Sequence, residues 1–238
     1  MVIKKKGGIG NFISEGFFKS LGFVRQNSGY IYLVSCLFLF FGLIGFLFPI
    51  FFKEEIVNII KELVEKTEGL NAFELTRFIF INNTLSSFFA IILGIMFGIF
   101  SIFTIVVNGY IVGFVSSFAV AEEGVSVLWR LLPHGIFEIP AIMISAGLGL
   151  KIGFSLLYEF VRKIKSVSKS LSYLLILILF ISFVFSFIPL LIMTIIDENL
   201  RKKFLDNLVN SLKVFVFVVI PLLVIAAIIE GVLIYFVV

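Results

Sequence analysis

Charged side chains are scarce in this chain. They make up 14% of the 238 residues, whereas 61% are hydrophobic, and the mean hydropathy is +1.19. Too few polar side chains remain to cover a water-soluble protein of this length. Several apolar runs also exceed the roughly 14 residues that suffice for a buried helix in a soluble domain. The sequence therefore predicts an all-α, polytopic bundle of transmembrane helices in the cell membrane, with the lipid bilayer as its immediate partner.

Cysteine and histidine are nearly absent as well. Cys36 is the single cysteine and lies in an apolar run, which excludes an intrachain disulfide and a cysteine-based metal site. His134 is the single histidine, and with Glu138 four residues later it supplies two metal ligands, whereas a catalytic zinc needs three. No H-E-x-x-H motif and no nucleophile with a base and an orienting group can be recognised. We therefore expect no metal, no cofactor and no enzymatic activity.

Basic residues outnumber acidic ones, giving a net charge of +4, but they gather beside apolar segments. The positive-inside bias and anionic lipid headgroups explain such clusters, so we expect no nucleic-acid partner. Lys and Arg number five in each of 1–29 and 151–170, and four, one and four in 53–77, 122–132 and 197–213. If these segments alternate across the membrane, the first group has ten basic residues against nine and two carboxylates against eleven. This pattern predicts that both termini are cytoplasmic.

The chain divides into a basic N-terminal helix over residues 1–29, at the cytoplasmic surface, and a transmembrane domain over residues 30–238. The first apolar run has no cleavage pattern and is expected to stay as a membrane anchor. Residues 78–121 carry no charge over about 44 positions, about twice what a helix needs to cross a bilayer, so they must turn once. We place that turn at Asn108-Gly109. About six spans result: 30–52, 80–105, 109–127, 132–153, 171–196 and 214–238.

The outer loop at 53–77 has a helical pattern of its own. Its apolar residues form one stripe, and its charged residues occupy the other positions, which is typical of an amphipathic helix at the membrane surface. Gly69 can end this helix, and Asn71 with Glu74 three residues later can cap the next one. The residues of the apolar stripe are Ile56, Ile59, Ile60 and Leu63.

Several polar residues fall inside the predicted spans, where ionisable groups are costly and usually have a role. Depth along the helices predicts two separate layers, an outer one with Asn82, Asn83, His134 and Glu138 and an inner one with Asn108 and Glu230. Glu230 would then not reach His134 unless segment 132–153 is re-entrant rather than spanning. His134 and Glu138 share one helix face, so they can form a structural pair, a proton-transfer or ion site, or part of a metal site.

Small residues and prolines indicate how the helices pack. Glycines four residues apart let helix backbones approach closely, and we expect this within the chain rather than between subunits, although a homo-oligomer is also compatible. Pro133 suits the first turn of a helix, whereas Pro140 lies deeper and should kink it. The glycines assigned to helix packing are Gly94, Gly98, Gly109, Gly113, Gly135, Gly149 and Gly153.

Several of these stretches occur together and in order: Asn82-Asn83, Gly94 with Gly98, Asn108-Gly109 with Gly113, Pro133-His134-Gly135 with Glu138 and Pro140, and residues 226–230. In this combination the sequence resembles the stage II sporulation protein M family of integral membrane proteins, from about residue 78 to 235. The resemblance implies a multi-spanning protein that works with peptidoglycan-degrading partners in spore-forming bacteria, without being the hydrolase. It does not imply that this chain takes part in sporulation.

Three functions are compatible with these sequence features. The first is a non-enzymatic membrane scaffold or complex subunit that recruits partner proteins in the membrane or envelope through its spans and segment 53–77. The second is a transporter or channel-like protein that uses the intramembrane His, Glu and Asn side chains. The third is a metal-dependent intramembrane hydrolase with its ion at His134 and Glu138.

Overall fold

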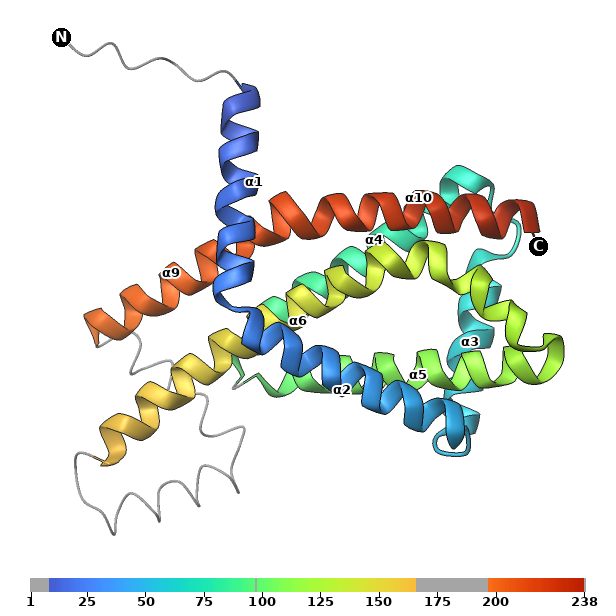
Figure 1. Cartoon of the computed structure of the whole chain (residues 1–238), viewed down its shortest axis with the longest axis horizontal. Coiled ribbons are helices and arrows are strands. Elements are labelled where there is room, and N and C mark those ends of the chain that lie inside the picture. Colours follow the sequence, from blue (N-terminus) through green and yellow to red (C-terminus); the bar gives the residue numbers. More distant parts are fainter. Residues whose placement is uncertain (1–8, 97, 166–196, 238) are drawn as a thin grey trace.

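The computed structural model describes residues 9–96, 98–165 and 197–237, and every regular element in these ranges is a helix (Figure 1). A 3₁₀ turn at Leu93–Ile95 follows α4, another at Val125–Val127 precedes α6, and a π-helical segment at Phe215–Val219 joins α9 to α10. The side chains of residues 130–134 lie outside the described part. The helices are α1 (Ile9–Gln26), α2 (Ser28–Leu47), α3 (Lys53–Thr67), α4 (Ala72–Ile92), α5 (Ile99–Glu123), α6 (Leu128–Lys165), α9 (Glu198–Val214) and α10 (Ile220–Val237).

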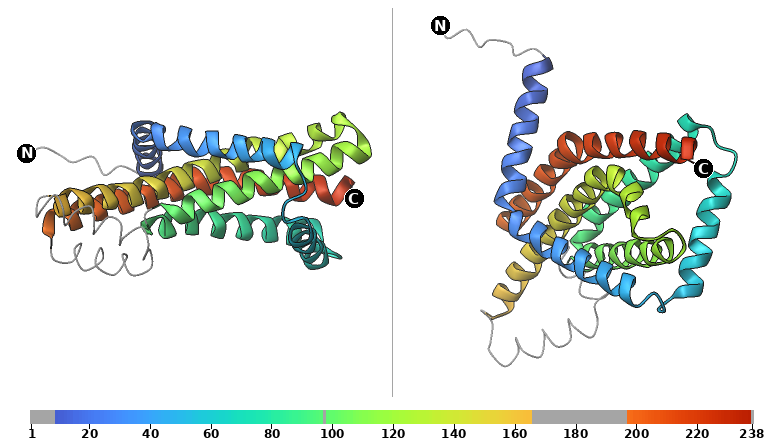
Figure 2. Two further views of the ribbon diagram at one scale, coloured as in Figure 1. Left: turned by 90° about the horizontal axis from the view of Figure 1, so that it is seen from below. Right: turned by 45° about the vertical axis from the view of Figure 1, so that its right-hand side comes forward.

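Five described helical segments are long and apolar enough to cross a membrane, which agrees with the predicted all-α transmembrane bundle. The predicted fifth span, 171–196, lies outside the described residues. Two further helices, α1 and α3, run across the direction of the spans at opposite ends of the bundle (Figures 1 and 2). The candidate spans are Ser28–Leu47, Ala72–Ile95, Ile99–Glu123, Gly135–Glu159 and Glu198–Tyr235.

The turn between the second and third spans lies at Gly98, so the prediction that it falls at Asn108-Gly109 is wrong. Gly98 has φ +74°, a left-handed conformation that glycine adopts at little cost. Asn108 and Gly109 instead lie inside α5, where the Asn108 side-chain amide donates to the Thr104 carbonyl at 2.7 Å. Gly109 serves close packing, because a Cβ there would lie 2.6 Å from the Phe38 carbonyl oxygen.

Helices α2 and α5 make the most extensive contact among the described helices, and glycines permit it. A Cβ on Gly113 would overlap the Gly42 carbonyl oxygen, and a Cβ on Gly45 would overlap the Tyr110 carbonyl oxygen. The sequence pattern singled out Gly113 but missed Gly42 and Gly45 of α2. This glycine seam is therefore used within the chain.

A second packing unit consists of α4, α6 and α10. Gly149 on α6 lies against the Ala90 carbonyl and against Gly94, and Ser101 donates to the same carbonyl at 2.9 Å. Leu148, Ile152 and Leu223 are completely or almost completely buried in this unit. Gly153 is buried as well, whereas a Cβ on Gly135 would meet, among the described residues, Ile139 of its own helix. Figure 1 shows that α6 changes direction in its N-terminal half, the half that holds Pro133 and Pro140.

The bundle has two distinct ends. The α1 end holds α1, the turn at residues 93–98, the C-terminal part of α6, and α9; the α3 end holds α3, residues 124–127 and the last described turn of α10 (Figures 1 and 2). Contacts define both ends, since Glu159 of α6 pairs with Lys203 of α9, and Gly231 of α10 lies against Thr76 in the first turns of α4.

This arrangement differs from the six-span topology with both termini on one side. That prediction places Glu159 and Lys203 at opposite ends of the bundle. The two side chains instead form an ion pair of 2.8 Å. Helix α10 therefore runs from the α1 end to the α3 end, opposite to the direction expected from the sequence.

Candidate functional site

Two carboxylic residues, Glu138 and Glu230, lie inside the candidate spans and come together in space. Glu138 is on α6 and Glu230 on α10, and these helices pack against each other and against α4. Both side chains are partly buried, and they are close enough for their charges to interact. The prediction of two separate polar layers is therefore wrong for Glu230, because the reversed direction of α10 brings it to the level of Glu138.

The surroundings of Glu230 are tightly packed and mostly apolar. Its neighbour Gly231 lets α10 approach α4, since a Cβ there would lie 2.9 Å from the Thr76 Cα. Leu75, Ile79 and Ala227 form a small buried cluster between the same two helices. The Oε2 atom of Glu230 is buried and accepts no hydrogen bond from the part of the chain that the structure describes.

Two hydroxyl groups of α4 share this property. Thr84 Oγ1 and Ser87 Oγ are buried without a hydrogen-bond partner among the described residues.

The two carboxylates, Glu138 and Glu230, repel each other when both are ionised. A proton held between Glu138 and Glu230 would relieve such repulsion.

The other polar residues predicted for the site are more scattered. Asn82 is exposed and Asn83 partly buried on α4, while Asn108 on α5 bonds to its own helix. Extensive packing between α5 and α10 is not found among the described helices, so the structure does not join Asn108 to Glu230 as one layer. His134 lies in α6, but its side chain is outside the described part, so its pairing with Glu138 stays a prediction.

The described residues were also compared with the requirements of a metal site. Groups of three or more His, Cys, Asp or Glu side chains suited to a metal ion are not found among the residues that the structure describes. The hydrolase interpretation therefore rests only on the H-x-x-x-E spacing of the sequence.

A second polar cluster, at the α1 end, was not predicted from the sequence. Glu159 is almost fully buried and accepts from Lys203 at 2.8 Å and from Arg162 at 2.7 Å. The local signal was a single acidic residue within the basic stretch 151–170. The partner Lys203 is 44 residues away in the chain, so only the tertiary structure reveals the pair.

The sequence of this chain also matches that of a known protein family. The sequence model of stage II sporulation protein M matches residues 34–233. Uncharacterized protein MJ0706 of Methanocaldococcus jannaschii is 42% identical over 78 residues, which cover 33% of this chain and 35% of that protein. Uncharacterized protein MJ0793 of the same organism is 36% identical over 93 residues, which cover 37% of this chain and 52% of that protein.

The chain thus matches about a third and about half of the length of these two curated relatives. No solved structure matches it. The family match covers three candidate spans completely, most of the first and last ones, and both carboxylates, Glu138 and Glu230. The chain belongs to the stage II sporulation protein M family.

Proposed function

We propose that this protein is a non-enzymatic subunit of a membrane complex and recruits partner proteins at the cell envelope. The observation that supports this most directly is the exposed position of α3. This helix links α2 to α4 at one end of the bundle, and among the described helices it makes no extensive packing contact. A linker of this kind can be held by a partner without disturbing the spans.

The two faces of α3 differ in chemistry. Its apolar side borders a cleft of about 510 Å³ that Phe41, Phe103 and Tyr110 also line, and Ile56 is its one buried residue. Its other side is exposed and carries carboxylates at residues 54, 62 and 65 beside Lys61 and Lys66, whereas Glu55 lines the cleft. The carboxylates outnumber the lysines, which fits a partner with a basic face, because opposite charges steer association and select the partner.

The distribution of charge indicates which side of the membrane α3 faces. Among the described residues, the α1 end carries ten Lys and Arg and five carboxylates, whereas the α3 end carries five Lys and Arg and eight carboxylates. Positively charged loops are retained in the cytoplasm. The α1 end is therefore cytoplasmic in this proposal, and α3 and the end of α10 face outward, toward the envelope.

The proposal is tested by isolating the protein from native membranes with a gentle detergent. We expect a specific, stoichiometric partner with the wild-type chain and its loss when Glu54 and Glu65 are both changed to Lys. Asp206→Lys is the matched control, since it reverses an exposed charge on α9 at the other end. Absence of any specific partner, or equal retention by the α3 variant, would contradict the proposal.

A second candidate function is proton- or ion-coupled transport, which the paired Glu138 and Glu230 favour. Reconstituted vesicles would then show a flux that Glu138→Gln and Glu230→Gln each reduce. The sequence suggests His134→Ala as a third variant of the same test. A flux indifferent to all three substitutions would remove this candidate and leave the scaffold proposal intact.

A further inference from the structure

A polar cleft opens at the α1 end, between the α1–α2 junction, α6 and α9. Its volume is about 750 Å³, and its lining includes Asn27, Tyr30, Lys151, Ser155, Lys203 and Asn207. Asn207 lies 3.5 Å from the Ser155 hydroxyl across the cleft. Amide, hydroxyl and ammonium groups thus converge there from three separate parts of the chain.

Positive charge in this cleft exceeds negative charge. Lys151 has no carboxylate within ion-pair distance among the described residues, and its ammonium lies 4.1 Å from the centre of the Phe23 ring. It is also close enough to Lys203 for the two positive charges to repel each other. Lys203 shares Glu159 with Arg162, so that carboxylate cannot neutralise Lys151 as well.

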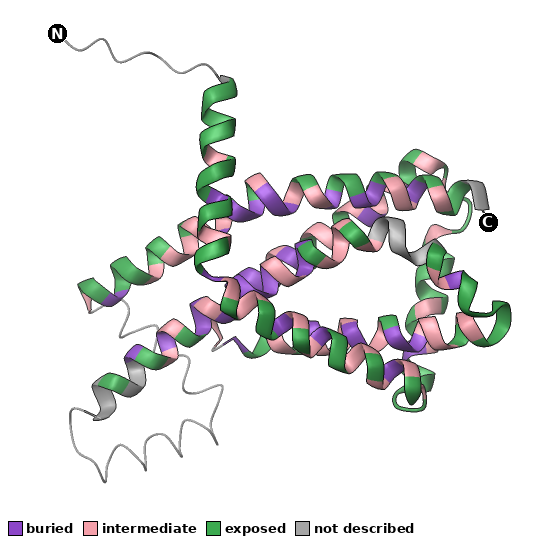
Figure 3. Cartoon of the chain, viewed as in Figure 1, coloured by how far each residue is buried: buried purple, intermediate pink, exposed green. Residues whose placement is uncertain are grey.

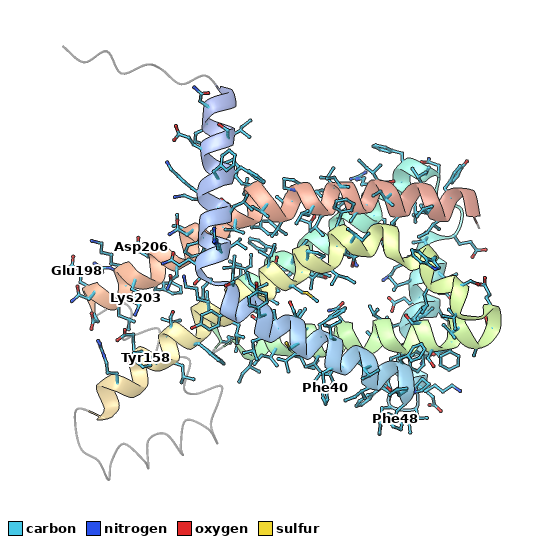
Figure 4. The ribbon with its side chains drawn as sticks, in the orientation of Figure 1. Phe40, Phe48, Tyr158, Glu198, Lys203 and Asp206 are labelled. Carbon is cyan, nitrogen blue, oxygen red and sulfur yellow. The ribbon has the colours of Figure 1, made fainter. Side chains whose placement is uncertain are left out.

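The cleft lies where a lipid headgroup would sit. Lys151 is within the candidate span Gly135–Glu159, eight residues before its end, so the cleft borders the membrane surface. Tyr158, another lining residue, has 66% of its surface exposed, and amphipathic aromatic side chains favour the headgroup level. Figure 3 shows exposed and partly buried residues in this part of α6 and α9, and Figure 4 shows Tyr158 and Lys203 at the same end of the molecule.

We propose that this cleft binds the phosphate headgroup of an anionic phospholipid from the leaflet at the α1 end. Lys151 contacts the phosphate, Asn207 and the Tyr30 hydroxyl donate hydrogen bonds, and the acyl chains leave the cleft along Phe154 and Tyr158, two aromatic residues of its lining. Basic pockets between transmembrane helices at the cytoplasmic surface recognise acidic headgroups in this way. Soluble phosphates share the headgroup chemistry, but the open apolar border of the cleft favours a lipid. Lipid binding at this cleft does not depend on any partner protein.

The test measures lipid binding to delipidated, detergent-solubilised full-length chain by native mass spectrometry. Phosphatidylglycerol and phosphatidylcholine are the lipid probes, and inorganic phosphate and glycerol phosphate are the soluble ones. We expect the wild type to prefer phosphatidylglycerol and Lys151→Gln to weaken that binding about fivefold, since a basic residue at the surface contributes about 1 kcal/mol. Lys151→Arg should restore it, because the positive charge returns.

Lys202→Gln is the matched control, because it removes an exposed charge from α9 beside Lys203 without lining the cleft. Circular dichroism and size-exclusion chromatography confirm that each variant is folded. Three results would overturn the proposal: no preference of the wild type for phosphatidylglycerol, equal weakening by Lys202→Gln, or Lys151-dependent binding of the soluble phosphates without lipid binding. The first uses the wild type alone, so the proposal stays falsifiable even if a variant misfolds.

Discussion

The two ends of the bundle differ in the sign of their charged residues and in what those residues contact. At the α1 end, basic residues predominate, and the buried Glu159 holds two of them across α6 and α9. At the α3 end, acidic residues predominate, and the ion pair described on α3, Glu62 with Lys66, is exposed within a single helix. At the α1 end an ion pair joins two separate helices, whereas at the α3 end the ion pair lies within one helix and is exposed. In our proposals the first end contacts acidic headgroups and the second end contacts a partner protein.

The largest expected effect concerns the side of the membrane that each end faces. In a Cys36→Ser background, Asn199→Cys on α9 should react with an impermeant thiol reagent only from the cytoplasmic side. Asn58→Cys on α3 should react only from outside, since both Asn58 and Asn199 are exposed. Labelling of intact cells and of inverted vesicles measures this as an all-or-none difference.

A reporter fused after Val238 provides the control, because the end of α10 lies with α3. It should be active outside the membrane. Labelling of residues 58 and 199 from the same side would contradict the comparison between the two ends.

Substitution of glycines at helix contacts should cause the next largest effect, which is a loss of stability. Gly149→Ala forces a Cβ onto the Ala90 carbonyl, a backbone atom that also accepts from Ser101, and we expect a loss of about 2–3 kcal/mol. Gly231→Ala at the α3 end meets the Thr76 hydroxyl, a side-chain atom that can move, and also the Thr76 Cα at 2.9 Å, and should cost about 1–2 kcal/mol. Denaturation in detergent micelles gives both values.

Gly22→Ala is the control for both substitutions, because a Cβ there has open space and alanine favours the helix. An equal loss for Gly149→Ala and Gly231→Ala would contradict the expected difference between the carbonyl contact at Gly149 and the mainly side-chain contact at Gly231.

The third largest effect is expected when the buried carboxylate of the α1 end, Glu159, is replaced. Glu159→Gln leaves Lys203 and Arg162 without their shared carboxylate, and hydrogen bonds to charged groups contribute about 1.5–3 kcal/mol. Both cations are more than half exposed, so water compensates them in part and the lower value of about 1.5 kcal/mol is expected. Glu65→Gln, the equivalent change on α3, should alter the unfolding free energy far less, because Glu65 is exposed. The reverse order of the two losses would refute the assignment of structural charge to the α1 end.

Local features of the fold could be predicted from the sequence. Asn71 and Glu74 form the expected capping box, with both Asn71 Oδ1 contacts and the Glu74 contact at 3.0 Å. The helix over α3 and its amphipathic pattern also follow from neighbouring residues alone. Such features depend on residues three or four apart, and their spacing is visible in the sequence.

Features that depend on distant contacts could not be predicted. Asn108-Gly109 is a typical turn sequence, yet Gly109 is needed against Phe38, and the chain reverses at Gly98 instead. The approach of Glu138 and Glu230 depends on the direction of α10, and the contact between Glu159 and Lys203 shows at which end α10 begins. Loop charges alone, ten against nine, were too evenly divided to reveal that direction.

The smallest expected effect is at the exposed pair of α3. Lys66 donates to Glu62 at 2.7 Å, and this hydrogen bond, with the lysine charge, lowers the pKa of the Glu62 carboxyl below its ordinary 4.5. A lowered folded-state pKa means that the pair stabilises the helix above pH 4.5 and ceases to do so as the pH falls through the folded value. Glu62→Gln should therefore reduce the melting temperature slightly at pH 7 and not at all below the folded pKa.

Measurements at high salt concentration test whether the Glu62–Lys66 ion pair causes this small effect. Exposed charges are screened at about 1 M salt, where the difference between wild type and Glu62→Gln should vanish. Glu65→Gln removes the same charge from the same helix but forms no ion pair among the described residues, so it should show no salt-dependent difference. A loss at Glu62 that persists in high salt would mean that α3 is held to the bundle through this side chain, and the contrast between a structural end and an outward-facing end would fail.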